Sequence, residues 1–271
     1  MKNRLIALAA LALVATGCLY IYKLEVPANR TWPAADLTAA AFHTLNGTVE
    51  VATTADTTVS AAITRRCFGR NRADAEAHID DIVITDTITG GRLSVVATAP
   101  SASARNYGAD FEIALPAGLA LDLRSSNGRL AVVGARSGIT ARTSNGAVSL
   151  TGTAGTTTIN TSNGAVAVAV HSGSITINTS NGAVDCDLVL LEATGHCRIE
   201  TSNGHVTLRL PADVSARFDL ATSNGDVTVG TGFGSVSYTV SERTRKTGTI
   251  GSGAAEVAVK SSNGSVTLLP R

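Results

Sequence analysis

Aromatic and charged side chains are scarce in this chain of 271 residues. Aromatic residues make up 4% and charged residues 16%, so the interior has to be filled mainly by small aliphatic and β-branched side chains. Such side chains suit thin β layers better than a thick globular core. The formal net charge is only +1, so there is no excess of one sign to attract nucleic acid. These absences favour an all-β fold and argue against nucleic-acid binding.

The N-terminal segment has the pattern of an export signal. Two positive charges precede an uncharged run over residues 5–22, and Ala15-Thr16-Gly17-Cys18 places a cysteine after two small residues. This pattern is typical of a bacterial lipoprotein, and it predicts a removed signal peptide over 1–17 and a lipidated Cys18. An uncleaved signal anchor is the alternative, because the run is about as long as a bilayer core requires. Both alternatives attach the protein to a membrane and place everything after Lys23 outside the cytoplasm, in the cell envelope.

The tripeptide Ser-Asn-Gly recurs along the rest of the chain at a nearly constant spacing. Between their asparagines, successive copies are 18, 18, 18, 22, 21 and 39 residues apart. A constant step with a few longer ones is typical of a coiled array with insertions, and the last step suggests two turns of which one is unmarked. A looser copy, Leu45-Asn46-Gly47, comes earlier. The marked positions are Asn127, Asn145, Asn163, Asn181, Asn203, Asn224 and Asn263.

Apolar and polar positions alternate on both sides of each marker. The positions three and five after the asparagine and four before it are almost wholly apolar, whereas the positions between them are mostly polar. Successive residues of a strand point to opposite faces, so each turn should contain two half-buried strands. We therefore predict a single-stranded parallel β-helix, or β-solenoid, with turns of about 18 residues.

The Ser-Asn-Gly tripeptide is expected to form the corner between the two strands of a turn. A tight reversal needs a positive φ, which glycine adopts freely and asparagine better than most residues. In a solenoid, equivalent positions stack about 4.8 Å apart, so the asparagine side chains are expected to form a hydrogen-bonded ladder with a structural role. The same dipeptide is also common in antiparallel hairpins, which is the alternative for these turns.

The repeats divide the chain into segments. Residues 18–41 are expected to be a tether or linker to the membrane, and 42–271 the solenoid. Within the solenoid, 42–116 is less regular and is predicted to form an N-terminal cap and the first turns, with a short helix or surface excursion near 73–78, whereas 117–271 holds the regular repeats.

The chain resembles the bacterial putative-adhesin family, a group of exported β-strand-repeat proteins of unknown function. The likeness rests on Thr-Ser-Asn-Gly-Ala-Val at 143–148, 161–166 and 179–184, and on Ile-Ala-Leu-Pro-Ala-Gly at 113–118. It covers roughly 42 to the C-terminus. The resemblance implies a repeat architecture, and it carries over no catalytic residue.

Two cysteines fall at inward positions of neighbouring turns. Cys186 lies five residues after Asn181, and Cys197 lies six before Asn203, so the two bracket an enlarged turn. An exported compartment permits disulfides, and we predict a Cys186–Cys197 disulfide, with a pair of buried thiols as the alternative. Cys67 is left single, with no nucleophile or metal site near it.

No residue pattern predicts a catalytic site, a metal site or a cofactor. The runner-up function is a carbohydrate-active β-helix enzyme, a polysaccharide lyase or hydrolase, which needs clustered carboxylates. The best acidic cluster does not recur in neighbouring turns; it comprises Asp185, Asp187 and Glu192, with His196, Glu200 and His205 nearby. Binding to ice or another flat surface would use the outward row Thr140, Thr158 and Thr176, but this row ends at Arg198.

The sequence therefore favours a non-catalytic envelope protein. We expect a lipoprotein with an adhesin-like solenoid for surface adhesion, structure or protein–protein contact, whose ligand or partner in the envelope is unknown.

Overall fold

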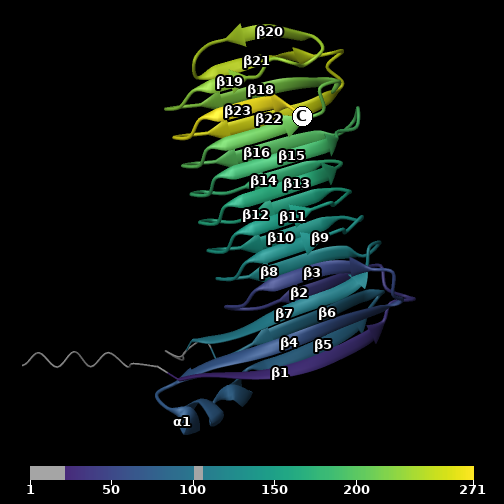
Figure 1. Ribbon diagram of the computed structural model, residues 1–271, viewed down its shortest axis with the longest axis vertical. Helices are drawn as coiled ribbons and strands as arrows, with labels where there is room; N and C mark the ends of the chain where they lie inside the picture. Colours follow the sequence, from purple (N-terminus) through teal and green to yellow (C-terminus); the bar gives the residue numbers. More distant parts are fainter. Residues whose placement is uncertain (1–21, 101–105) are drawn as a thin grey trace, which may run out of the picture.

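Two long β-sheets run the length of the molecule and face each other across a narrow apolar core (Figure 1). The computed structural model describes residues 22–100 and 106–271. Sheet A has 11 strands and sheet B has 12. Each regular turn of the chain contributes one strand to each sheet, so the turns stack along one axis. The prediction of an all-β fold with stacked parallel strands is confirmed.

The order of strands in each sheet differs from their order in the sequence. Sheet A runs β1 (Tyr22–Pro33), β4 (Thr58–Gly69), β7 (Tyr107–Pro116), β3 (Val49–Thr54), β9 (Leu130–Val133), β11 (Val148–Thr151), β13 (Val166–Ser172), β15 (Val184–Leu190), β17 (Val206–Leu210), β23 (Val266–Pro270), β19 (Val227–Val229). Sheet B runs β20 (Val236–Ser241), β21 (Arg245–Ile250), β18 (Ala216–Thr222), β22 (Ala255–Ser261), β16 (His196–Thr201), β14 (Ile175–Asn178), β12 (Thr157–Asn160), β10 (Ile139–Thr143), β8 (Ala120–Ser125), β2 (Ala39–His43), β6 (Arg92–Thr98), β5 (Val83–Thr89).

The regular turns keep their repeat positions in register. Ile139 of β10 pairs with Leu121 of β8 on one side and with Thr157 of β12 on the other. In sheet A, Val148 of β11 pairs with Val166 of β13. Most inward side chains are buried and most outward ones are at least partly exposed, as the alternation in the sequence requires. Equivalent apolar side chains therefore stack into continuous columns between the sheets.

The folded unit begins earlier than the boundary at residue 42 that the repeats suggested. From Tyr22 the chain forms β1, which pairs with β4 along its whole length in antiparallel orientation. Trp32 and Leu37 are buried in the common core. Residues 22–41 are thus part of the fold and do not form a linker. Strand β1 lacks the Ser-Asn-Gly marker because it is an edge strand outside the regular stack.

The last marked turn is inserted out of sequence order. Strand β22 lies between β16 and β18, and β23 lies between β17 and β19. The turn of Asn263 therefore sits between those of Asn203 and Asn224. The 39-residue step contains the antiparallel hairpin of β20 and β21, which covers β18, and the expectation of an unmarked turn was wrong.

The N-terminal end uses the same arrangement. Strands β2 and β3 come first in the stack by sequence, yet they lie between β6 and β7 on one side and β8 and β9 on the other. Antiparallel strands β1, β4 and β5 cover this end. The short helices α1 (Arg72–Glu76) and η1 (Ile79–Asp81) lie between β4 and β5 in the chain. Antiparallel strands therefore close both sheets at the N-terminal end and sheet B at the C-terminal end, which limits edge-to-edge association. At the C-terminal end, sheet A stops at the short parallel strand β19.

The glycine of each corner is required for a reason other than the one expected. Positive φ angles occur at other glycines, and none of the corner asparagines or glycines has one. A Cβ atom on Gly164 would instead lie 1.8 Å from the carbonyl oxygen of Gly146 in the turn below. The same clash recurs at Gly128, Gly146, Gly182, Gly204 and Gly264. The backbones of successive corners touch, and only glycine leaves room for this contact.

Gly164→Ala should therefore destabilise the fold strongly. Because the obstructing atom is backbone, we expect a loss of about 3 kcal/mol or more in unfolding free energy, at the upper end of overpacking effects. The measurement is the urea unfolding midpoint, with Gly118→Ala as the control, since a Cβ there meets no atom within 4 Å. Similar midpoints for the two variants would contradict the backbone-contact explanation.

Candidate functional site

The corner asparagines lie one above the other and are joined by side-chain hydrogen bonds. Asn163 Nδ2 donates to Asn145 Oδ1 at 2.7 Å, and Asn181 donates to Asn163 at 2.7 Å. The series continues through every marked corner in the spatial order of the turns. From the N-terminal end it runs Asn46, Asn127, Asn145, Asn163, Asn181, Asn203, Asn263, Asn224.

A second series of hydrogen bonds lies just inside the asparagines. The Thr161 hydroxyl donates to the carbonyl of Gly146 in the turn below and accepts from the N–H of Gly164 in its own turn, both at 3.2 Å. Each such hydroxyl is nearly buried and satisfies two backbone groups. Sequence reasoning missed these residues, although the position two before each asparagine always holds Thr or Ser. They are Ser125, Thr143, Thr161, Thr179, Thr201, Thr222 and Ser261.

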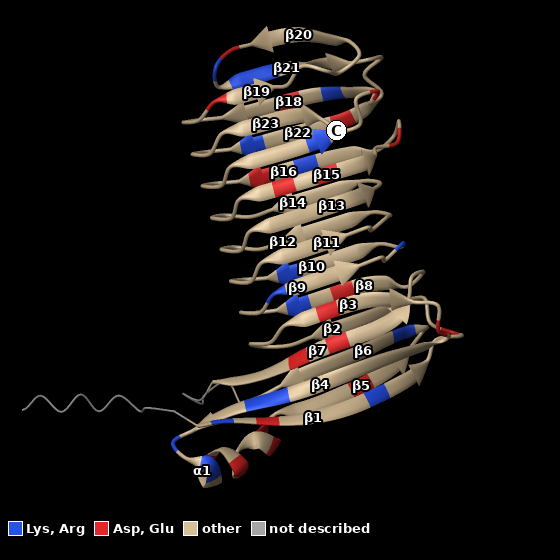
Figure 2. Ribbon diagram, viewed as in Figure 1, with Lys and Arg blue, Asp and Glu red and all other residues tan. Residues whose placement is uncertain are grey.

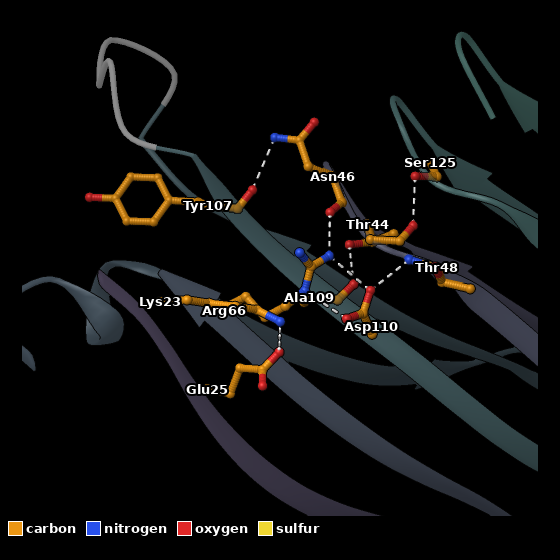
Figure 3. A network of polar contacts seen from close by, with 11 residues as sticks. Lys23, Glu25, Thr44, Asn46, Thr48, Arg66, Tyr107, Ala109, Asp110 and Ser125 are labelled. Atoms are coloured by element: carbon orange, nitrogen blue, oxygen red, sulfur yellow. Dashed lines mark hydrogen bonds and ion pairs between the residues drawn. The ribbon is translucent and has the colours of Figure 1, made fainter. Parts of the chain in front are cut away.

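A charged network closes the N-terminal end of the asparagine series (Figure 3). Asn46 Nδ2 donates to the carbonyl of Tyr107 at 3.0 Å, because no further asparagine lies below it. Arg66 donates to the carbonyl of Asn46 at 2.7 Å and to Asp110 at 2.9 Å. Asp110 in turn accepts from the N–H of Thr48 at 2.8 Å. This network fixes the first corner against strands β4 and β7.

An open groove follows the corner on the side of sheet B. It consists of two adjoining hollows of about 460 and 580 Å³ that share Asn178 and Thr179. Three residues of each turn line it, namely those one, two and three positions before the corner asparagine. We call this surface the corner groove. Its serines are Ser126, Ser144, Ser162, Ser180, Ser202, Ser223 and Ser262.

The groove serines are exposed, and their hydroxyls have no hydrogen bond to any other described residue. The groove therefore offers a row of free hydroxyl groups at the spacing of the turns, about 4.8 Å. Charge is confined to its two ends: Arg124 and Arg142 at one, Glu200 and Lys260 at the other. The strands between, β11 to β14, are uncharged (Figure 2).

The acidic cluster noted in the sequence is divided between opposite faces. Asp185 and Asp187 lie on the outer face of sheet A, where they form ion pairs with Arg209 and Arg271. Glu200 lies on β16 in sheet B and is the one carboxylate among the described residues that line the groove. The described residues contain no group of three or more side chains able to hold a metal ion.

The other residues of that cluster also lie apart. Glu192 is exposed in the loop before β16, and His196 lies on β16 within 3.4 Å of Thr176. His205 accepts a hydrogen bond from the N–H of Ser265 at 3.2 Å. The outward threonines Thr140, Thr158 and Thr176 are in register, but Asp122 and Arg198 bound this row.

The cysteines with inward positions lie in the core. Cys186 of sheet A and Cys197 of sheet B are thiols in the structure and are fully buried. A hydrogen bond with Cys197, together with burial, raises the pKa of the Cys186 thiol well above its ordinary value. Both side chains therefore belong to the same apolar core. Cys67 is buried on β4, and Cys18 lies outside the described residues.

Comparison with known families identifies the fold. The family model for Toastrack DUF4097 matches residues 77–269. The chain belongs to this family. The predicted resemblance to a family of β-strand-repeat proteins is confirmed, and the solenoid of stacked turns is a toastrack domain. A search of curated proteins gives no match.

Two solved structures are similar to this toastrack protein. One is a putative cell adhesion protein from Clostridium sporogenes, with 11% identity and a TM-score of 0.40, covering 92% of this chain and 100% of that one. The other is a putative adhesin from Bacteroides fragilis, with 9% identity and a TM-score of 0.42, covering 90% and 97%. Within the described part of the toastrack protein, no helix has the length and apolar character needed to cross a membrane.

Asn163→Asp should weaken the asparagine series. The carboxylate still accepts from Asn181 but cannot donate to Asn145, whose Oδ1 then faces a negative charge. Because this site is exposed, we expect a loss of about 1 kcal/mol in unfolding free energy, measured from the urea midpoint. Ser162→Ala in the same corner is the control and should change stability by less than about 0.5 kcal/mol. Equal midpoints would mean that the asparagine bonds contribute nothing to stability.

Proposed function

We propose that this toastrack protein is a non-catalytic envelope protein that binds an extended ligand along the corner groove. The observation that carries the proposal is the row of free serine hydroxyls, repeated in every marked turn beside the asparagines. Because strands on both sides fix the corner, these groups are held in place before a ligand arrives. A preorganised row of donors and acceptors loses little entropy on binding.

The geometry suits a polymer better than a small molecule. The groove is open along its length, and its polar groups are distributed over many turns and do not converge on one point. Small-molecule sites are usually concave, largely apolar and have a few convergent polar groups. A polysaccharide chain has hydroxyls along its length that match such a row, which is consistent with an adhesin-like role.

The carboxylates favour binding over catalysis. Glycoside hydrolysis ordinarily uses two carboxylates on either side of the scissile bond. Among the residues lining the groove, Glu200 stands without a second carboxylate, and it pairs across the strands with Lys260. A carbohydrate-active enzyme therefore has weaker support than a binding protein.

The proposed anchor lies close to the fold. Strand β1 begins at Tyr22, four residues after Cys18. Four extended residues span at most about 14 Å. A lipid on Cys18, or a signal anchor over 5–22, would hold the N-terminal end of the stack near the membrane surface. The corner groove then extends away from the membrane, where an envelope or surface ligand can reach it.

Removing hydroxyls from the groove should weaken polymer binding. We expect the triple variant Ser144→Ala, Ser162→Ala, Ser180→Ala to bind at least about tenfold more weakly, since each lost hydrogen bond contributes roughly 0.5–1.5 kcal/mol. The measurement is biolayer interferometry of the full chain on immobilised neutral and acidic polysaccharides. The control removes outward hydroxyls of sheet A: Ser149→Ala, Thr207→Ala, Thr267→Ala. Equal affinities for the two triple variants would place the binding site elsewhere.

We further propose that the chain is a lipoprotein with a Cys186–Cys197 disulfide. The burial of both thiols at inward positions of one core and an oxidising envelope support the pairing. An intact-mass spectrum of protein from native membranes should show a chain that starts at diacylated Cys18 and gains the mass of two hydrogens on reduction. A chain that starts at Met1 would instead indicate a signal anchor, and no mass change on reduction would indicate free thiols.

A further inference from the structure

Three arginines share a single carboxylate, and two of them, Arg124 and Arg142, line the N-terminal end of the corner groove. Arg92 of β6, Arg124 of β8 and Arg142 of β10 lie on the outer face of sheet B. Their guanidinium nitrogens lie 2.8, 3.0 and 3.7 Å from the carboxylate oxygens of Asp122. We call these four residues the arginine cluster.

The cluster has more positive than negative charge. Asp122 is the one carboxylate within ion-pair distance of any of the three arginines in the described part of the chain. Burial by itself would raise the pKa of Asp122, but the hydrogen bonds and charges of Arg124, His43 and Arg92 outweigh burial and hold it below its ordinary value. Burial lowers the pKa of the neighbouring His43, which is therefore neutral at pH 7. Three guanidinium groups against one carboxylate leave two positive charges without a partner.

The opposite end of the groove is balanced. There Glu200 and Lys260, one of each sign, are neighbours on the adjacent strands β16 and β22. On the adjoining strands β18 and β21 of sheet B, Arg245 pairs with Asp219 at 3.2 Å. The local excess of charge is thus a feature of the N-terminal end, and the overall net charge of +1 does not reveal it. Figure 2 shows the basic strand segments of β8 and β10 next to the uncharged turns.

Many of the N–H donors of the three arginines have no hydrogen-bond acceptor among the described residues. Their side chains are 45%, 49% and 48% exposed, whereas that of Asp122 is 14% exposed. Arg142 makes no hydrogen bond with another described residue, and Arg92 makes one, to Asp122. A guanidinium group has five N–H donors arranged in a fork that matches carboxylate, sulfate and phosphate oxygens. Asp122 therefore orients the arginines while most of their outward donors remain available.

We propose that the arginine cluster is a subsite for the anionic groups of an acidic polysaccharide whose remaining length lies in the corner groove. Arg124 and Arg142 line the groove together with Ser126 and Ser144, so one chain can contact both. The neutral turns that follow present only hydroxyl and amide groups, which suit sugar hydroxyls. This inference rests on the proposed function and specifies the substrate class of the same groove.

The test uses the full chain and three immobilised polymers: polygalacturonate, dextran sulfate and neutral dextran. The wild type should bind at least one acidic polymer about tenfold more tightly than dextran, because charge-assisted hydrogen bonds are about twice as strong as neutral ones. The polymer that is preferred shows whether a carboxylate or a sulfate is recognised. Binding should weaken as salt concentration rises.

The decisive variant is the double change Arg124→Gln, Arg142→Gln, and the control is Arg209→Gln. Arg209 is an outward arginine of sheet A that also pairs with an aspartate, so its loss changes net charge on the opposite face. We expect the double variant to lose at least about tenfold in affinity for the acidic polymer and the control to lose less than about twofold. Circular dichroism and the urea midpoint establish that both variants remain folded.

The possible outcomes distinguish a failure of the anionic subsite from a failure of the proposed polymer-binding function. If the serine triple variant weakens binding while the arginine double variant behaves like Arg209→Gln, the groove binds polymer and the anionic subsite is wrong. The same conclusion follows if dextran binds as tightly as both acidic polymers. If none of the polymers binds the wild type, the polysaccharide-binding function itself fails, and the anionic subsite fails with it.

Discussion

The contact between the backbones of successive corners sets the geometry of the whole molecule. The carbonyl of one corner glycine lies against the Cα of the next, at a distance that admits no side chain. This close approach brings the Thr or Ser hydroxyl of each turn within reach of the glycine carbonyl below it, as for Thr161 and Gly146. It also brings the asparagine amides into hydrogen-bonding distance. The corner therefore determines which residue of one turn lies above which residue of the next.

The register at the corner determines the register of the strands on either side. Once Asn163 lies above Asn145, Val166 lies beside Val148 in sheet A and Ile159 beside Ala141 in sheet B. A slip of one residue would turn the apolar columns outward and expose them. The same register produces the corner groove, because it places serines of successive turns in a line. The proposed binding surface is thus a direct result of the contacts that hold the fold together.

The sequence predicted those features that depend on spacing within one turn. The step of 18 residues and the alternation around each marker were sufficient to predict parallel stacking and inward positions such as Val148 and Ile159. The position of the Asn263 turn was not predictable. All marked turns have nearly the same residue pattern and the same strand edges, so the sequence does not indicate which turn lies next to which. Strand β1 was not predicted, because it is an antiparallel edge strand and has no Ser-Asn-Gly corner that would mark it in the sequence.

The candidate site was predictable only in part. The hydroxyl column that includes Thr161 was visible in the sequence, but its role depends on a glycine carbonyl in another turn. Arg124 and Arg142 occupy equivalent positions before their asparagines and could have been paired. Arg92 belongs to the irregular N-terminal region, and its place beside Asp122 depends on β6 pairing with β2, which no repeat indicates.

The inserted turn makes the two ends of the chain unequal during biosynthesis. Strands β16 and β17 obtain their final neighbours from β22 and β23, which come after β18 to β21 in the chain, so the turn of Asn263 lies inside the stack and not at its end (Figure 1). Turns up to Asn203 can assemble as the chain emerges, but the Asn224 turn has no permanent place until β22 and β23 are available to pair with it. The upper part of the stack therefore takes its final form only after β22 and β23 have been made, and without these two strands the apolar columns of β16 and β17 would be open to solvent.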